Sequence, residues 1–312
     1  MVEIFVNLKR FEVPKKMGGV CPDQDPEAWI SRVIRESVEL GLGKAEDVVV
    51  IYLVPEALII SAMKEVEEYP DSDRRSIRVG CQGVFRENVK KGRNFGAFTT
   101  NFPAAAARNL GCYWSIIGHS EERKDKLEVI AAYDHRVEEE EAEFLKARAA
   151  VNGIVNMEVI SALESGINVL VCIGEMEKER GGGNFKEQKP RIEKVLRDQI
   201  KQSLKGIEKY LPQRKVVIGY EPVWAIGPGK TPPGAEYISF VSSFIKKTVL
   251  ELFDTNLPVV YGGGLKEENA AMIAGIETID GGLIALTRFT GEIGFEPSGL
   301  VGIIEAYRTG LK

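Results

Sequence analysis

The sequence predicts a closed (β/α)8 barrel: one domain in which eight parallel strands are surrounded by an outer ring of helices. Eight short apolar runs recur along the 312-residue chain, amphipathic helical patterns separate most of them, and no Pro-, Gly- or Ser-rich linker divides residues 1–312. A hydrophobic content of 44% is enough for a substantial core. The alternative is a doubly wound open sheet, but no GxGxxG motif follows the first strand.

The eight apolar runs are nearly continuous rather than alternating, which is typical of parallel strands covered on both faces. We predict strands over residues 3–7, 48–54, 76–82, 112–118, 168–174, 215–220, 257–263 and 281–286.

Helical patterns fill most of the intervals between these strands. Asp25 can cap the first helix, Pro26 suits its first position, and Gly41 can end it. The apolar face of this helix consists of Ile30, Val33, Ile34 and Val38. Residues 185–211 and 234–253 are also long and amphipathic. A last helix carries Leu300, Ile303, Ile304 and Tyr307 at the i, i+3, i+4, i+7 spacing.

One βα unit is unusually long. After the fourth strand an acidic insertion runs over about residues 122–162, with the sequence EEEEAE at 138–143. We interpret it as the solvated face of an extended helix.

The composition excludes several classes of protein. A net charge of −5 gives no basic surface for nucleic acid and no polybasic patch for membranes. The four cysteines are far apart and form no CxxC pair, so we expect reduced thiols rather than disulfides or a zinc site. The N-terminus has no signal-peptide pattern, and no apolar run reaches membrane-spanning length. We therefore expect a cytoplasmic protein.

Polar residues follow several of the predicted strands, at the end of the barrel where such folds build their active sites. They are Asn7 and Lys9 after strand one, His119, Ser120 and Glu121 after strand four, Glu221 after strand six and Gly262, Gly263 and Gly264 after strand seven. Each alone has an ordinary structural explanation, such as a solvated lysine, a helix-capping glutamate or a turn glycine. Their convergence on one rim favours catalysis.

Together these residue types suit the movement of a carbonyl group between adjacent carbons. That reaction needs a base for a C–H proton, a group that polarises the carbonyl, and a positive charge for the developing enediolate. Glu221, His119 and Lys9 supply these in that order. The apolar, glycine-containing stretch after Glu221 can close as a lid that excludes water.

The segments around these residues resemble triosephosphate isomerase over essentially the whole chain and in the same order. The matching segments are VNLK, GAFTTNFPAAAARNLGCYWSIIGHSEERKD, VLVCIGE, IGYEPVWAIGPGKTPP and VVYGGGLKEENA. The fourth, with its glutamate and lid, is the most specific.

The resemblance implies the roles of individual residues, which are those known for triosephosphate isomerase itself. It makes Glu221 the general base, His119 the neutral electrophile, and Lys9 the group that stabilises the enediolate. Asn7 positions the substrate, Glu121 supports the lysine and the proton shuttle, and Tyr261 holds the closed lid. The lid comprises Pro222, Val223, Trp224, Ala225, Ile226, Gly227, Pro228, Gly229 and Lys230.

The resemblance also implies a glycolytic and gluconeogenic isomerase that uses no metal and no organic cofactor. It implies a homodimer in which the loop at 96–99 enters the partner subunit. This loop reads GAFTTN and lacks the acidic residue that usually follows GAFTG, so we do not expect all of the standard dimer contacts.

The sequence departs from the family where the substrate phosphate is bound. Gly227 keeps the lid glycine, but Gly264 replaces the usual serine, and Ala285 and Leu286 replace the paired glycines after strand eight. Backbone N–H groups remain there, although side chains now crowd the approach. Arg288 can bind the phosphate instead, or Thr290 and Gly291 can form a new anion site, while the simple alternative is that Arg288 faces solvent.

Three functional hypotheses remain open. The first is interconversion of dihydroxyacetone phosphate and glyceraldehyde 3-phosphate. The second is the same chemistry on a four-carbon ketose or aldose phosphate, and the third is a binding homologue with negligible turnover.

Overall fold

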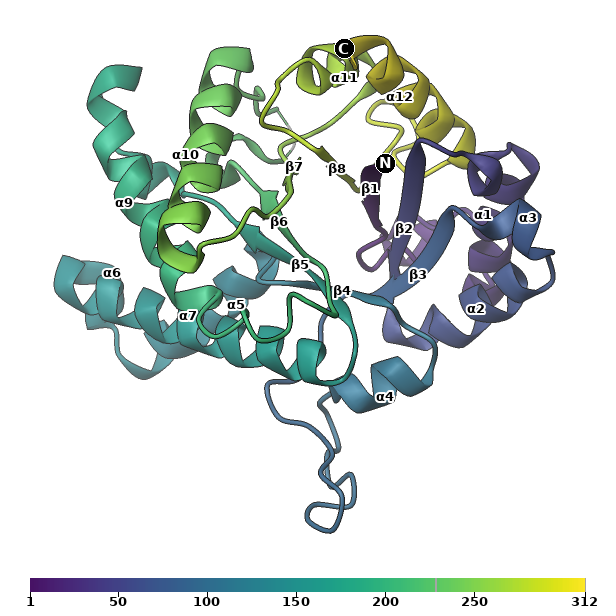
Figure 1. Ribbon diagram of the computed structural model, residues 1–312, viewed down its shortest axis with the longest axis horizontal. Coiled ribbons are helices and arrows are strands. Elements are labelled where there is room, and N and C mark those ends of the chain that lie inside the picture. The colour runs from purple at the N-terminus through teal and green to yellow at the C-terminus, as the bar shows by residue number, and fades with distance from the viewer. Residues whose placement is uncertain (228, 312) are drawn as a thin grey trace.

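In the computed structural model, which describes residues 1–227 and 229–311, eight parallel strands close into one barrel in chain order (Figure 1). They are β1 (Val2–Asn7), β2 (Val48–Val54), β3 (Ile77–Cys81), β4 (Trp114–Ile117), β5 (Asn168–Ile173), β6 (Val216–Tyr220), β7 (Val259–Tyr261) and β8 (Gly281–Ile284). Pairing of β1 with β8 closes the barrel. The predicted fold class is confirmed, and each strand begins and ends within two residues of its predicted range.

Helices surround the barrel (Figure 1). The α-helices are α1 (Pro26–Glu39), α2 (Ile59–Glu67), α3 (Asp71–Arg74), α4 (Ala104–Asn109), α5 (Ser120–Tyr133), α6 (Arg136–Glu139), α7 (Glu141–Glu164), α8 (Glu177–Arg180), α9 (Phe185–Ser203), α10 (Ala235–Phe253), α11 (Glu267–Ala274) and α12 (Pro297–Gly310). Short 3-10 helices are η1 (Lys15–Met17), η2 (Leu42–Lys44), η3 (Glu56–Leu58) and η4 (Val223–Ala225).

The boundaries of α1 follow from its sequence. The Asp25 side chain accepts a hydrogen bond from the backbone N–H of Glu27 at 2.9 Å, and Pro26 occupies the first turn. Gly41 follows the helix at φ 83°, a conformation that glycine adopts without steric cost. The predicted caps of α1 are therefore confirmed.

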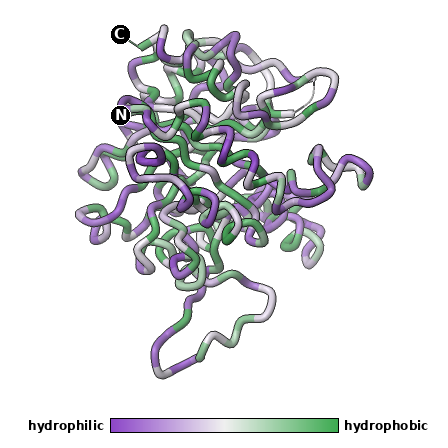
Figure 2. Tube along the Cα trace, turned by 90° about the vertical axis from the view of Figure 1, so that its right-hand side faces the viewer, coloured by the Kyte–Doolittle hydropathy of each residue, from purple (hydrophilic) through white to green (hydrophobic). Residues whose placement is uncertain are grey.

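The core has two layers, and in Figure 2 apolar segments concentrate inside the molecule. The two layers arise because successive side chains of a strand point to opposite faces. In β5, Leu170 and Cys172 point into the barrel, whereas Val169 and Val171 pack beneath the helices. The barrel interior is filled by Phe5, Ile51, Leu53, Trp114, Ile116, Leu170, Cys172, Val217, Val260 and Leu283. The strands are thus held rigidly, and their carboxyl ends form a fixed rim.

Three helices, rather than one extended helix, occupy the long acidic segment after β4. The acidic run falls at the junction of α6 and α7, where Glu140 is the N-cap residue and Glu141 and Glu143 lie in the first turn of α7. Carboxylates are favoured at a helix N-terminus, so the run marks a helix start. The chain breaks at Asp134, whose carboxylate accepts the backbone N–H of Arg136 at 3.1 Å.

A buried charge cluster joins α5 to α7. Lys126 pairs with Glu122 and lies 3.1 Å from Glu158. Burial and the nearby charge of Glu122 raise the pKa of Glu158 to about 9. The Glu158 carboxyl therefore favours its protonated form more strongly than an exposed glutamate does.

Replacing Glu158 with glutamine should remove a pH dependence of stability. Because the folded pKa lies above the unfolded value of 4.5, the contribution of Glu158 is complete below about pH 4.5 and is lost as pH rises through about 9. The unfolding free energy of Glu158→Gln minus that of the parent should therefore rise by about 1–3 kcal/mol when the pH is raised from 5 to 8. Urea unfolding at the two pH values measures it, with the exposed Glu128→Gln as control. An equal difference at both pH values would contradict the prediction.

Two further features of the chain bear on its interactions. The segment between β3 and α4 projects from the barrel, seen at the bottom of Figure 1, and its Phe95 is 89% exposed. No helix of the described residues is long and apolar enough to cross a membrane.

Candidate active site

Glu221 follows β6 directly, and its carboxylate is buried against the N-terminus of α5. The backbone N–H of Ser120 donates to Glu221 Oε2 at 3.0 Å, and the Ser120 hydroxyl donates to Oε1 at 3.2 Å. His119 Nε2 lies 3.1 Å from the same Oε1. Helix N-termini attract anions, so these donors and the helix dipole hold the carboxylate in place. The sequence places Ser120 at the end of strand four, but it does not indicate these contacts with Glu221.

His119 is the N-cap residue of α5. The turn from β4 requires Gly118, whose φ of 75° disfavours any side chain, and Arg123 fixes that turn by donating to the Gly118 carbonyl at 2.7 Å. His119 Nδ1 accepts a hydrogen bond from the backbone N–H of Glu121 at 3.4 Å. This pattern assigns the proton of a neutral imidazole to Nε2, which faces Glu221.

Lys9 stands at the end of β1 in a constrained backbone conformation. Its φ is 43°, and its N–H donates to Asn7 Oδ1 at 3.0 Å. Gln82, just beyond β3, donates to the Lys9 carbonyl at 2.7 Å and to Asn7 Oδ1 at 3.3 Å. Asn7 and Gln82 therefore position the backbone of Lys9. Gln82 was missed in the sequence, although its place at the end of a predicted strand was a usable signal.

Glu121 links the lysine to the histidine. Lys9 Nζ lies 2.7 Å from Glu121 Oε1, and His119 Nδ1 lies 3.7 Å from Glu121 Oε2. Burial acts to raise the pKa of Glu121, but the hydrogen bond and charge of Lys9 outweigh it and lower the pKa. The structure thus brings together Glu221, His119, Glu121 and Lys9.

The lid residues after Glu221 are anchored through Trp224. Its indole N–H donates to Glu175 Oε1 at 2.7 Å, and the Arg180 guanidinium lies 3.7 Å from the indole ring centre. Pro222 precedes η4, Gly227 has a φ of 116°, and Lys230 lies 3.6 Å from Glu177. Pro228 lies outside the described residues.

Glu175 ends the VLVCIGE segment and is a fully buried carboxylate that is not among the predicted site residues. It accepts hydrogen bonds from Trp224, from Tyr237 at 2.7 Å and from Tyr220 at 3.1 Å. Burial raises its pKa. Tyr261, predicted to hold a closed lid, donates here to the Gly263 carbonyl at 3.0 Å.

A cavity of about 500 Å³ adjoins these residues. Lys9, Ser120 and Glu121 line one part of it, and the lid residues Val223, Ile226 and Gly227 line another. The lid therefore borders open space next to the candidate catalytic groups.

Arg288, beyond β8, is occupied by its own loop. Its Nε donates to the Glu292 carbonyl at 3.0 Å, and its guanidinium lies 3.5 Å from the Glu292 carboxylate and 4.0 Å from that of Glu296. Arg288 lines a cavity of about 30 Å³ near Lys15 rather than the cavity beside Lys9.

The remaining candidates for phosphate binding differ in exposure. Ala285 and Leu286 are partly buried, whereas Thr290 and Gly291 are exposed. Within residues 1–227 and 229–311, the backbone N–H groups of Gly227, Gly264, Ala285 and Leu286 donate to no protein acceptor. In the same residues, no group of three or more His, Cys, Asp and Glu side chains is placed to hold a metal ion.

Comparisons with known proteins agree on one family. The family model described as "Triosephosphate isomerase" matches residues 30–292. The triosephosphate isomerase of Chloroherpeton thalassium is 34% identical over 215 residues, covering 68% of this chain and 71% of the relative. That of Dictyoglomus thermophilum is 29% identical over 255 residues, covering 80% and 85%.

A solved structure shows the same fold. The crystal structure of triosephosphate isomerase from Bartonella henselae superposes with a TM-score of 0.67 and covers 98% of this chain and 99% of its own. At 20% sequence identity this similarity concerns the fold alone.

Proposed function

Because the chain belongs to the triosephosphate isomerase family, a family of isomerases, we propose that it interconverts dihydroxyacetone phosphate and glyceraldehyde 3-phosphate through an enediolate. One observation carries the proposal: Glu221 Oε1 lies 3.1 Å from His119 Nε2, on the rim that also holds the Lys9–Glu121 pair. A base, a polarising donor and a cation therefore surround one small volume.

In this mechanism Glu221 takes the C–H proton next to the substrate carbonyl. The Nε2–H of His119 donates to the carbonyl oxygen and then exchanges protons with the two enediolate oxygens, while Lys9 stabilises their negative charge. The Glu221 carboxylate must first leave its hydrogen-bonding positions next to Ser120 and His119 and move to the C–H group of the substrate. Movement of the adjoining lid, beginning at Pro222, supplies that displacement and excludes water.

We propose that backbone N–H groups bind the phosphate. Among the described residues, the N–H groups of Gly227, Gly264, Ala285 and Leu286 have no acceptor in the protein, and this supports the proposal because backbone N–H groups bind phosphate without side-chain charge. Arg288 is less suited, since its guanidinium already contacts Glu292 and Glu296. Thr290 and Gly291 remain a second choice for the anion site.

A coupled assay with each triose phosphate tests the proposed reaction. We expect interconversion in both directions, together with incorporation of solvent deuterium at the substrate α-carbon. Absence of both would refute the reaction. Phosphate-ester binding without deuterium exchange would instead support the binding homologue.

The crowded end of β8 favours one alternative substrate class. Ala285 and Leu286 bring side chains to a position where the family has glycines, so the phosphate of a four-carbon sugar can suit the site better. Specificity constants for four-carbon phosphates should then exceed those for the trioses. Equal or lower values for every four-carbon phosphate would exclude this alternative.

We further propose a single-domain cytoplasmic homodimer in which residues 122–162 are an insertion into the barrel. The projecting segment between β3 and α4, with its exposed Phe95, supports a contact between subunits. Sedimentation equilibrium of the parent and of Phe95→Ser tests this assembly, which should weaken in the variant.

A further inference from the structure

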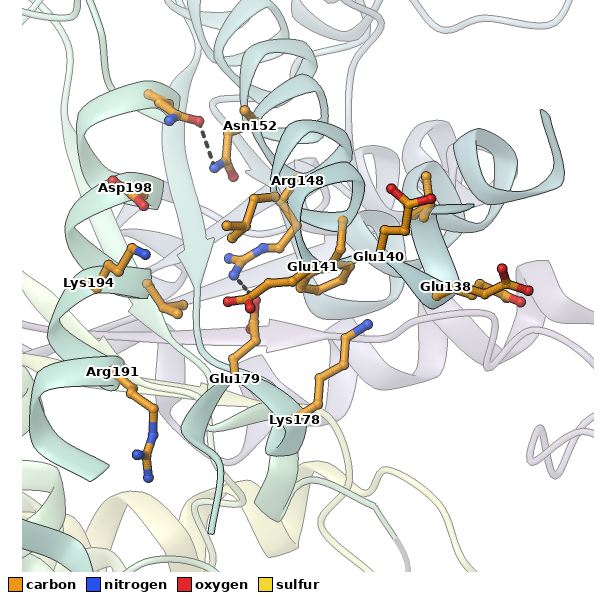
Figure 3. A pocket seen from close by; sticks show the side chains of 17 residues that line it. Glu138, Glu140, Glu141, Arg148, Asn152, Lys178, Glu179, Arg191, Lys194 and Asp198 are labelled. Carbon is orange, nitrogen blue, oxygen red and sulfur yellow. Dashed lines mark hydrogen bonds and ion pairs between the residues drawn. The ribbon is translucent and has the colours of Figure 1, made fainter. Parts of the chain in front are cut away.

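A second cavity, of about 440 Å³, lies between the inserted helices and the pair α8 and α9 (Figure 3). Its volume falls in the range of roughly 300–1,000 Å³ that is usual for small-molecule sites. None of Asn7, Lys9, His119, Glu121 and Glu221 lines it. The cavity therefore lies apart from the candidate catalytic residues, although Arg148, Asn152 and Glu179 line both it and the cavity beside Lys9.

Charges of both signs and apolar groups line this cavity. At its centre the largely buried side chain of Arg148, from α7, pairs with Glu179 of α8 (Figure 3). Lys178 and Lys194 also line it, and neither has a carboxylate within ion-pair distance among the described residues. Glu138 and Glu140 point away from the central pair in Figure 3.

The other side chains that line the cavity suit a ligand that also donates hydrogen bonds. Glu141 and Asp198 have no ion-pair partner among the residues described, and both line the cavity. Phe144 adds an aromatic ring, above which Lys178 Nζ lies at 3.4 Å. Cations for a phosphate, carboxylates for N–H donors and an aromatic wall for a flat ring thus occur together.

We propose that this cavity binds a nucleoside monophosphate, and that binding acts on the lid of the active site. The phosphate contacts Lys178, Lys194 and Arg148, while base N–H groups face Glu141 or Asp198. This regulatory role rests on the proposed function, whereas the binding site itself does not.

The helix α8 connects the cavity to the lid. Its Glu179 pairs with Arg148 and also accepts the backbone N–H of Met176 at 2.8 Å. On its other side, Arg180 stacks on Trp224, and Glu177 lies near Lys230. Arg148 and Glu179 also line the cavity that contains Lys9 and Ile226, so this ion pair borders both spaces.

The effect on the lid has a definite direction. A phosphate at Arg148 competes with Glu179 and loosens α8, which holds Trp224 in the position seen here. A lid that is held less firmly closes more readily over substrate. The ligand should therefore lower the KM for substrate, by about fivefold or more if the coupling is typical of allosteric sites.

Binding is tested by calorimetry with AMP, CMP, GMP and UMP, each added to the full chain. At least one should bind with a Kd below about 1 mM, and ribose 5-phosphate should bind about tenfold more weakly. The double variant Lys178→Ala/Lys194→Ala should weaken binding by about tenfold or more, whereas Lys186→Ala, on the exposed part of α9, should not. No binding by any of the four, or binding unchanged in the double variant, would overturn the site.

The connection to the lid is tested with Arg180→Met, which keeps the cavity and removes the charge over Trp224. The nucleotide should change the fluorescence of Trp224, assigned with Trp224→Phe, and lower KM in the parent. In Arg180→Met it should still bind by calorimetry but produce neither effect. A KM that the nucleotide leaves unchanged or raises in the parent would overturn the coupling. Binding and fluorescence need no turnover, so failure of the proposed reaction leaves these two readouts intact.

Discussion

Glu221→Asp is expected to reduce turnover by about 10²-fold or more, because proton transfer is sensitive to a misplacement of about 1 Å. The shorter side chain keeps the negative charge but withdraws the carboxylate by one methylene group. It also pulls the carboxylate away from Ser120 and His119, which lie 3.0–3.2 Å from it in the parent. The measurement is kcat together with deuterium exchange at the substrate α-carbon.

Two controls separate a lost base from a damaged fold. Glu221→Gln keeps the size of the side chain and should abolish exchange altogether, while binding of a phosphate ester persists. Glu305→Asp shortens an exposed glutamate of α12, away from the cavity beside Lys9, and should leave kcat unchanged. A parental rate in Glu221→Asp would show that Glu221 is not the base.

The fold could be predicted because its strands are buried on both faces and therefore read as apolar runs. The number and the boundaries of the inserted helices α5, α6 and α7 were harder to predict. α5 is mostly exposed and has Ala131 as its only buried residue, so its apolar pattern is weak. The break at Asp134 depends on a local side-chain hydrogen bond that residue types alone do not specify.

The candidate site shows a similar division. Residues at the ends of parallel strands must converge on one rim, so Glu221, His119 and Lys9 could be placed together from sequence. Gln82 and Glu175 also stand at the ends of predicted strands, but an amide and a single carboxylate do not by themselves indicate one role, and their hydrogen-bond partners appear only in the structure. Gln82 contacts Asn7 and Lys9, and Glu175 receives Trp224 and Tyr237.

Arg288 shows how contacts within a loop bear on a predicted ligand. A conspicuous cation after β8 suggested a phosphate ligand, but the loop that carries it folds back through the Arg288–Gly294 bridge. That bridge brings Glu292 and Glu296 to the guanidinium. Loop geometry of this kind depends on pairing within the loop, which the spacing of the residues did not reveal.

Lys9→Met is expected to lower kcat/KM by about 10²–10³-fold, the usual cost of removing one donor that stabilises a developing oxyanion. Methionine has a similar length and keeps the side chain apolar along its stem, so the change removes mainly the ammonium group. The backbone of Lys9 remains held by Asn7 and Gln82. Steady-state kinetics on the triose phosphates give the value.

The variant also leaves Glu121 without its partner at 2.7 Å, which offers a second explanation for any loss. The double variant Lys9→Met/Glu121→Gln removes that unpaired charge. If Lys9 stabilises the enediolate, the double variant should stay about as slow as the single one. Recovery of activity in the double variant would mean that Lys9 serves only to neutralise Glu121.

A matched control is Lys16→Met, which replaces an exposed lysine of η1 and should have the same kcat/KM as the parent. Glu121 is itself largely exposed, so water can solvate the freed carboxylate, and the loss in Lys9→Met should come from the missing ammonium group.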